Sequence, residues 1–441
     1  MFETLKTAFK IKEIRRKIFI TLGLILVYRL GCWIPIPGID VAAMSASIQG
    51  NDFMGLMSAI TGGSLQYGTF FAMGIGPYIN ASIIMQLLTV GIPALERLQK
   101  QGEDGRKKIA QYTRYATIIL GIIQAVGILV GLGSSVSGGL LDSSLFPAHL
   151  GWLQYIALII IFCAGTAFTM WIGERITEHG VGNGISLLIF VGILSSAGNA
   201  LISTVSQALG LADSQNQQMQ IWSLIFFLAT VIIIFSLIVF VDLAERKIPV
   251  QYAKQVKGRK MYGGQSTHIP MKVNASGVLP LIFAFALLSF PQLIANMIAP
   301  NGGFAIWWAT YLGTGTWLYA LIVAVLIVFF AFFYAQIQFN PEDVSRNIQQ
   351  YGGFIPGIRP GKPTTEYLAK INNRITLFGA IFLALVALVP SLIFSAVSQG
   401  NAGLINAFST TGLLIVVSVA LEFDKQLEAQ IMTRHYKGFM G

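Results

Sequence analysis

The chain alternates long apolar runs with polar segments, and ten of the runs are long enough to cross a lipid bilayer as a helix. This pattern predicts an all-α polytopic membrane protein with ten transmembrane helices. Hydrophobic residues make up 54% and charged residues 11% of the sequence, which excludes an ordinary soluble domain. The runs cover approximately residues 18–34, 70–92, 115–133, 152–173, 185–205, 221–241, 278–298, 317–337, 375–397 and 404–423.

The second run contains residues that lipid-facing helices normally avoid. Its central part, GIGPYINASIIMQLL at 74–88, carries Gly74, Pro77 and Asn80. The segment before it, 51–64, is apolar but much shorter than the ~20 residues of a full crossing. We predict backbone here that enters the membrane without crossing it, which is tolerated only inside protein or beside a cavity.

Ile79 and Ile83 lie four residues apart in this run, so their side chains stack on one helical face. Two interpretations are open. The pair either packs between helices, as most buried isoleucines do, or forms part of a wall that faces a path through the protein.

Basic residues indicate the orientation, because Lys and Arg near span ends stay on the cytoplasmic side. Of the 29 Lys and Arg residues, 28 lie before the first run, after an even-numbered run, or in the tail. We therefore predict that both termini are cytoplasmic. Arg29 is the exception, and we expect it either to extend toward the membrane interface or to meet backbone carbonyl groups.

Two cytoplasmic loops, 246–272 and 339–374, are too long to be simple connections between helices. The first has alternating stretches on both sides of residues 257–260, which predicts a β-hairpin. In the second, two prolines stiffen a glycine-rich tip that presents Arg359 for a specific contact, or simply to solvent. We interpret these basic loops as docking surfaces for a protein partner or anionic RNA, with a lipid-headgroup patch as the alternative.

The apolar runs lack the groups that membrane chemistry requires. No run contains a central Asp or Glu, and all four histidines lie outside the runs. This argues against an ion-coupled relay, an intramembrane aspartyl protease and a zinc protease. Cys32 and Cys163 have no spacing typical of a disulfide framework or a metal site. We predict no enzymatic activity, no metal and no cofactor.

Small and polar residues interrupt two later runs near their starts. The fifth run opens with GVGNGIS at 180–186, which includes Asn183, and the seventh is preceded by Asn274 and Gly277. Such irregular spans are expected where helices separate or line a path.

Five motifs occur in order from the N-terminal part to the C-terminal part of the chain. They are GIGPYINASIIMQLL at 74–88, QGEDGRKKIAQYTRY at 101–115, GVGNGISLLIF at 180–190, QSTHIPMKVNASGVLP at 265–280 and GGFIPGIRPG at 352–361. Together they resemble the bacterial SecY family of protein-translocation channel subunits. The resemblance runs from the N-terminus to the tail and looks closest to Firmicute-type members.

The resemblance implies two inverted five-helix halves around a central hourglass pore. The N-terminal half is 1–205, and the C-terminal half is 206–441, with long cytoplasmic loops at about 242–274 and 338–374. A plug at about 51–64 is represented by Phe53, Met54, Leu56, Met57 and Ile60. An apolar pore ring, able to resist wetting and to close around a passing chain, is implied at Ile79, Ile83, Ile189, Ile193, Ile282 and Ile415.

The resemblance also implies a lateral gate and a docking surface. Gate positions are Gln86, Gln124, Asn274, Phe290 and Pro291. Positions that engage a motor or the ribosome are Lys254, Lys257, Arg259, Lys260 and Arg359.

The implied function is translocation of unfolded polypeptides across the bacterial cytoplasmic membrane, with lateral release of hydrophobic segments. Implied partners are SecE, SecG, the SecA motor, the ribosome with its RNA, signal peptides, nascent polypeptides and membrane lipids, but not DNA. A small-solute secondary transporter is the alternative, and the absence of central carboxylates argues against it.

Overall fold

The computed structural model describes most of the chain, and the account below concerns only the described residues. These are residues 2–49, 57–58, 60–133, 151–208, 217–252, 255–257, 260–262, 266–274, 277–298, 302–313, 316–397 and 410–437.

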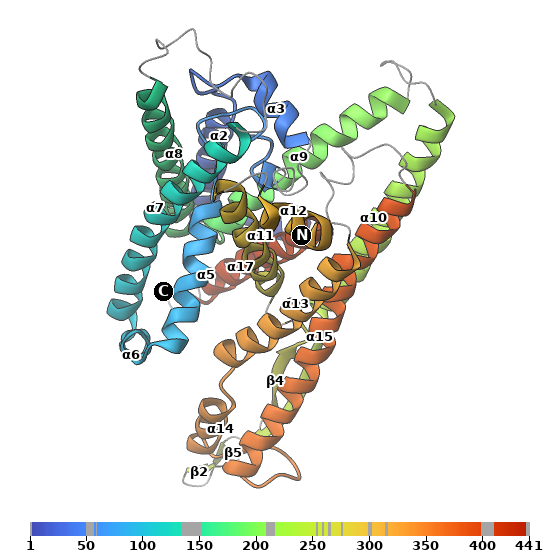
Figure 1. The fold of residues 1–441 in the computed structure, drawn as a ribbon. Helices are drawn as coiled ribbons and strands as arrows, with labels where there is room; N and C mark the ends of the chain where they lie inside the picture. Colours follow the sequence, from blue (N-terminus) through green and yellow to red (C-terminus); the bar gives the residue numbers. More distant parts are fainter. Residues whose placement is uncertain are drawn as a thin grey trace.

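Every predicted apolar run overlaps a helix, as expected when the backbone must satisfy its own hydrogen bonds in lipid. Figure 1 shows the helices of the N-terminal part, in blue to green, beside the long α10, α13 and α15. The helices are α1 (Phe2–Lys10), α2 (Lys12–Gly31), α3 (Val41–Gln49), α5 (Gly76–Gly91), α6 (Pro93–Lys100), α7 (Glu103–Gly133), α8 (Gly151–His179), α9 (Gly184–Ala208), α10 (Gln217–Leu243), α11 (Leu279–Ile298), α12 (Gly303–Leu312), α13 (Trp317–Gln338), α14 (Pro341–Gln350), α15 (Lys362–Val397) and α17 (Thr410–Lys437).

The number of crossing helices stays a prediction. Within the described ranges, four helices are long and apolar enough to cross a membrane, or five if the bent pair α5 and α6 counts as one span. Several predicted spans contain only shorter apolar helices, such as Leu279–Leu288 in α11. One apolar helix, α12, was not predicted, because its run is only ten residues long.

The second predicted span begins later than predicted and ends within one residue of the predicted position. Helix α5 begins at Gly76 rather than near residue 70, because Gly74 adopts a positive φ of 50° and Pro77 stands in the first helical turn. At the other end the chain turns by 99° into α6, where Pro93 stands in the first turn. Residues 61–75 form turns and one isolated β-bridge, so the part of the predicted span at 70–75 is not helical.

The predicted β-hairpin is present and belongs to a small sheet outside the helical bundle. Strand β1 (Glu245–Tyr252) pairs antiparallel with β4 (Ser266–Lys272), and Ile248 lies opposite Ile269. Two short strands, β2 (Gln255–Lys257) and β3 (Lys260–Tyr262), pair at the hairpin tip. The second long loop adds β5 (Gly353–Phe354) to the free edge of β1, so the sheet order is β4-β1-β5.

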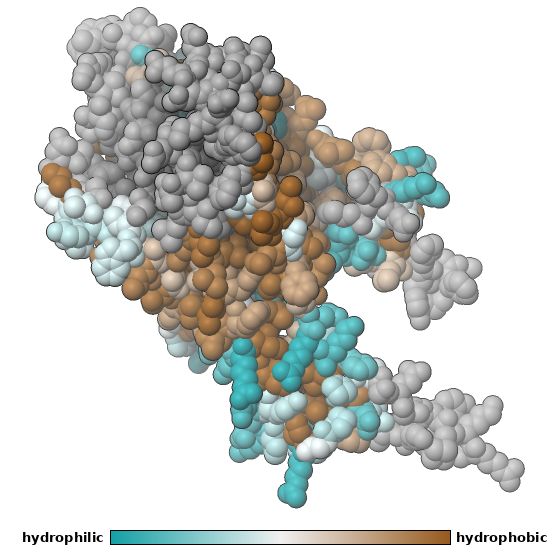
Figure 2. All heavy atoms as spheres, turned by 90° about the vertical axis from the view of Figure 1, so that its right-hand side faces the viewer, coloured by the Kyte–Doolittle hydropathy of each residue, from teal (hydrophilic) through white to brown (hydrophobic). Residues whose placement is uncertain are grey.

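A separate hydrophobic core joins the two long loops into one unit. Val250 of β1, Ile348 of α14 and Leu368 of α15 are buried together there. In Figure 1 this unit lies at the bottom, beyond the ends of the long helices, and Figure 2 shows it as a lobe rich in polar side chains below a broad apolar band. The loops are therefore a folded surface carried by α15, which extends as a helix back to Lys362.

We predict that Leu368→Ala loosens this unit, because it removes a side chain with 0% exposure from a packed core. The expected cost is about 2–5 kcal/mol. Limited proteolysis should then cut the segment 242–274 faster than in the parent. Leu377→Ala on the same helix is the control, since Leu377 is 46% exposed and lies outside this core. Equal cutting of the two variants would contradict a shared core.

Candidate functional site

The six isoleucines predicted to form a ring come from four helices and meet at one junction. Ile189, Ile193 and Ile415 are buried in one hydrophobic cluster, and Ile83 is buried in a neighbouring cluster. Ile79 and Ile282 are partly buried and pack against both clusters. The junction therefore joins α5 and α9 of the N-terminal part to α11 and α17 of the C-terminal part.

Glycine and asparagine at the start of α9 set the position of its two isoleucines. The Asn183 Oδ1 atom accepts a hydrogen bond from the Ile185 amide at 3.1 Å and so caps the first turn. A Cβ at position 184 would overlap the carbonyl of Gly173, so the glycine allows α9 to approach α8 closely.

A polar cavity of about 550 Å³ lies against one side of the isoleucine junction. Ile189, Ile282 and Ile415 belong to its lining. The other lining groups are mostly polar and include both signs of charge, from Asp242, Lys272, Asn183, Ser186, Glu422, Lys425 and Gln426. An apolar constriction that faces a polar vestibule is a suitable geometry for admitting a hydrated chain and stopping ions.

Asn274, a predicted gate residue, is buried in this vestibule. Its Nδ2 donates to Asp242 Oδ1 at 3.0 Å, and the preceding amide of Val273 donates to the Ala244 carbonyl at 3.0 Å. The residue thus ties the start of α11 to the end of α10. The contact with Asp242 was not predicted from the sequence, because a contact across 32 residues leaves no local pattern.

The predicted plug is described only in part. Met57, Ser58 and Ile60 are helical, and Phe53, Met54 and Leu56 lie outside the described residues. Met57 packs against a cluster of the N-terminal part, and Ile60 packs against the cluster that contains Ile193. The short helix therefore borders the isoleucine junction.

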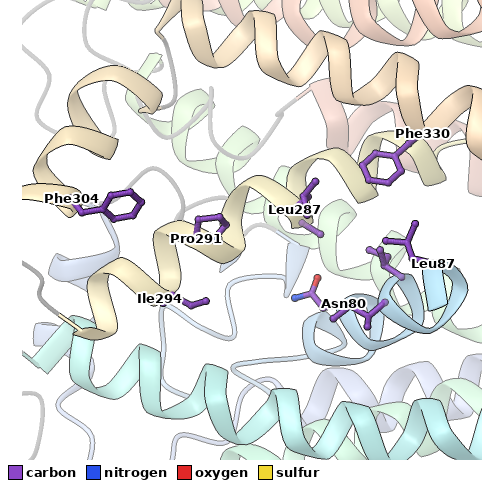
Figure 3. Close-up of a pocket in the computed structure, with 10 residues that line it drawn as sticks. Asn80, Leu87, Leu287, Pro291, Ile294, Phe304 and Phe330 are labelled. Carbon is purple, nitrogen blue, oxygen red and sulfur yellow. The ribbon is translucent and has the colours of Figure 1, made fainter. Parts of the chain in front are cut away.

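A second cavity, of about 420 Å³ and almost wholly apolar, lies between α5 and α11. Figure 3 shows Asn80 and Leu87 on one side of it and Leu287 and Pro291 on the other. Asn80 is its single polar lining residue among the described part of the chain. The lining is Asn80, Ile83, Ile84, Leu87, Ala286, Leu287, Pro291, Ile294, Phe304 and Phe330.

Of the five predicted gate residues, Pro291 is the one whose described side chain lines this cavity, and Asn274 lines the vestibule instead. Gln86 donates from Nε2 to the Ser82 hydroxyl of its own helix at 3.3 Å. Gln124 is half-buried on α7, and the side chain of Phe290 lies outside the described atoms. The apolar lining was missed, although residues 80, 83, 84 and 87 repeat at helical spacing on one face of α5.

The predicted docking residues lie on the folded loop unit. Arg359 is exposed between Gly357 and Gly361, which have positive φ angles of 83° and 99°. Its carbonyl accepts a hydrogen bond from Thr364 Oγ1 at 2.9 Å, which fixes the tip against the start of α15. Lys257 and Lys260 face each other in the hairpin register, and Lys254 and Arg259 lie outside the described residues.

An ion pair between helices was not predicted. Arg114 of α7 donates to both carboxylate oxygens of Glu174 of α8, at 2.9 and 2.8 Å. Such a bidentate pair holds two helices in a fixed relation. Among the described residues, no group of three or more His, Cys, Asp or Glu side chains is arranged to hold a metal ion.

The sequence of this chain was compared with protein families and with curated proteins. The model of the SecY family matches residues 69–423. The chain belongs to the SecY family. Two curated relatives named "Protein translocase subunit SecY" align with 100% of both chains covered: that of Streptomyces coelicolor is 44% identical over 447 residues, and that of Halalkalibacterium halodurans is 43% identical over 441 residues. The resemblance stated from the motifs is confirmed, and a Firmicute is among the relatives.

Solved structures share the SecY-family fold. One described as "The structure of a protein conducting channel" gives a TM-score of 0.68 at 21% identity, covering 94% of this chain and 92% of that one. Another, "Sec61 in the Canine ribosome-channel complex from the endoplasmic reticulum", gives 0.65 at 20% identity with the same coverage. This SecY-family chain is therefore a multi-pass membrane protein of the cell membrane.

We predict that Leu287→Trp reduces occupancy of the apolar cavity several-fold, because the larger side chain fills space that the cavity now offers. Binding of a small apolar fluorescent probe to the purified protein measures this. The control is Leu237→Trp on α10, since Leu237 has a similar exposure but does not line the cavity. Equal probe binding by both variants would show that the probe does not use this cavity.

Proposed function

We propose that this chain is the channel subunit of a protein translocase, which passes unfolded polypeptides outward and releases hydrophobic segments sideways into the membrane. The observation that carries the proposal is the meeting of six isoleucines from four helices beside a polar vestibule. The names of the curated relatives agree with it.

The ring Ile79, Ile83, Ile189, Ile193, Ile282 and Ile415 forms the constriction. Branched apolar side chains offer water and ions no hydrogen bonds, so a narrow collar of them dewets. The same side chains have no polar groups with which to retain a passing chain. The collar thus closes around a polypeptide without binding it.

The apolar cavity between α5 and α11 serves the lateral path. A hydrophobic segment that leaves the vestibule would bury its side chains against Ile84, Leu87 and Leu287 before it enters lipid. Gln86, Gln124, Asn274, Phe290 and Pro291 belong to the helices or helix starts that would move apart. The short helix within 51–64 acts as the plug, since it borders the junction from one side.

The folded loop unit binds the partner that drives translocation. Its hairpin and the rigid tip at Arg359 form a basic surface for the SecA motor or the ribosome, which includes RNA contacts. SecE and SecG are the expected companion subunits, and a small subunit of one to three spans should co-purify from native membrane. Both termini are cytoplasmic in this proposal. The chain is divided into two inverted halves, residues 1–205 and residues 206–441.

The solute-transporter alternative has no supporting observation. The apolar runs contain no central carboxylate that would couple an ion gradient, and the polar vestibule ends at an apolar junction rather than at an array of polar ligands.

We predict that replacing Ile83, Ile189 and Ile282 with Gly raises the ion leak of reconstituted vesicles, because the collar would admit water. Dye release or membrane current in the absence of client protein measures the leak. The control is Ile232→Gly, a replacement on the exposed face of α10. Unchanged conductance in the triple variant would refute the ring assignment.

We predict that Arg359→Glu abolishes motor-dependent secretion while abundance and membrane insertion stay normal. The side chain is exposed, so the replacement should alter docking and leave packing intact. The control is Arg106→Glu, which reverses another exposed cytoplasmic charge at the start of α7. Normal secretion by Arg359→Glu would remove this residue from the docking surface.

A further inference from the structure

The short helix that includes Met57, Ser58 and Ile60 ends in a glycine turn of defined geometry. The Gly63 amide donates to the Ser58 carbonyl at 2.8 Å, and Gly62 has a positive φ of 72°. A six-to-one hydrogen bond over a left-handed glycine is the Schellman ending of a helix. The last carbonyl groups of a helix carry a partial negative charge, so this end attracts a cation.

Arg29 of α2 supplies a cation at that helix end. A Cβ at position 62 would lie 2.5 Å from Arg29 Nη1, so the guanidinium lies directly against the glycine turn. Nη1 is buried and has no hydrogen-bond partner among the described residues. Arg29 as a whole is half-buried, but a buried guanidinium nitrogen without a hydrogen bond is costly, and the adjacent carbonyl end of the short helix offsets part of that cost.

Gly192 of α9 borders the same helix end from another side. A Cβ at position 192 would overlap the Ile60 carbonyl oxygen, and it would lie 3.3 Å from the Ile60 carbonyl carbon and 3.4 Å from the Gly62 nitrogen. The helix end therefore fits against α9 only because residue 192 is glycine. The next residue, Ile193, belongs to the isoleucine junction, so this contact adjoins the constriction.

We propose that Arg29 and Gly192 together form the retaining contact of the plug: the arginine through its charge, the glycine by leaving space. The inference rests on the proposed channel function. Retention by charge and dipole is weak and reversible, and it involves no side-chain hydrogen bond that must break. When the short helix moves away from α2 and α9, water reaches the Arg29 guanidinium. Hydration of this cation then offsets the lost contact with the helix end.

Two simpler roles for these residues make different predictions. If Arg29 only fills space beside α2, an uncharged side chain of similar length replaces it without effect. If Gly192 serves only the packing of α9 on α8, a methyl group there does not change the position of the short helix.

The test measures how readily Ser58 becomes accessible. The reporter chain contains Ser58→Cys, at a position that is 5% exposed in the parent chain. Its two native cysteines are removed by Cys32→Ala and Cys163→Ala, so that a maleimide reacts at position 58 alone. A membrane-impermeant maleimide is added to the outer side of vesicles without client protein. Arg29→Gln should speed labelling by about threefold to thirtyfold, the range expected for loss of a charge at a helix end. Arg29→Lys should label nearly as slowly as the parent, and Gly192→Ala should label faster.

The control variant is Arg175→Gln, which changes an arginine that contacts Trp171 and Glu178 instead of the short helix. Unchanged labelling in Arg29→Gln and Gly192→Ala would overturn the inference, as would equally fast labelling in Arg29→Lys and Arg29→Gln. If Arg29→Gln does not accumulate, Gly192→Ala decides alone. The labelling rate and the ion leak are measured independently. If the isoleucine variants leak but the Arg29 and Gly192 variants label at the parent rate, only the retaining contact is refuted. If the Arg29 and Gly192 variants label faster but the isoleucine variants do not leak, only the proposed pore is refuted.

Discussion

The burial of non-helical backbone at residues 61–75 is the constraint on which the rest of the site depends. Backbone polar groups inside a membrane protein need partners, and this segment finds them in its own turns and in Ile34, whose carbonyl accepts from the Phe70 amide at 3.1 Å. Three helices make room for the segment through glycine: Gly31 of α2 lies against the Phe71 ring, Gly165 of α8 against the Phe70 carbonyl, and Gly192 of α9 against the Ile60 carbonyl. A side chain at any of these three positions would displace the segment, and with it both the short helix and the start of α5.

Polarity is divided sharply around the isoleucine junction. The vestibule holds Asp242, Lys272, Glu422 and Lys425, whereas the cavity between α5 and α11 is lined by apolar side chains and one asparagine. Opposite charges in one vestibule give it little net preference for the sign of charge on an entering chain. The lateral cavity, by contrast, selects for apolar surface. In the proposed channel, a translocating polypeptide would therefore contact a polar environment in the vestibule and an apolar one in the cavity between α5 and α11.

Hydrophobic runs and alternation predicted much of the fold, but long-range contacts could not be read from them. The runs gave the helices, and alternation in 246–272 gave the hairpin, since these patterns are local. The spacing of Ile79 and Ile83 gave a face of α5, and only the family resemblance selected their four partners. Contacts such as Asn274 with Asp242 or Arg29 with Gly62 depend on tertiary packing, and no spacing rule encodes them. The boundary of α5 was wrong at its start because hydropathy does not register the positive φ of Gly74.

Helix α5 connects the isoleucine junction to the apolar cavity between α5 and α11, because Ile83 takes part in both. Its side chain is buried in the cluster at the junction and also lines the apolar cavity toward α11. A rigid helix cannot move one of these contacts without the other. In the proposed channel, separation of α5 from α11 would therefore widen the isoleucine ring and open the apolar cavity in one motion. In such a channel, the polarity of the client segment decides its path. A polar segment stays within the isoleucine ring, whereas an apolar segment lowers its free energy by moving into the apolar cavity.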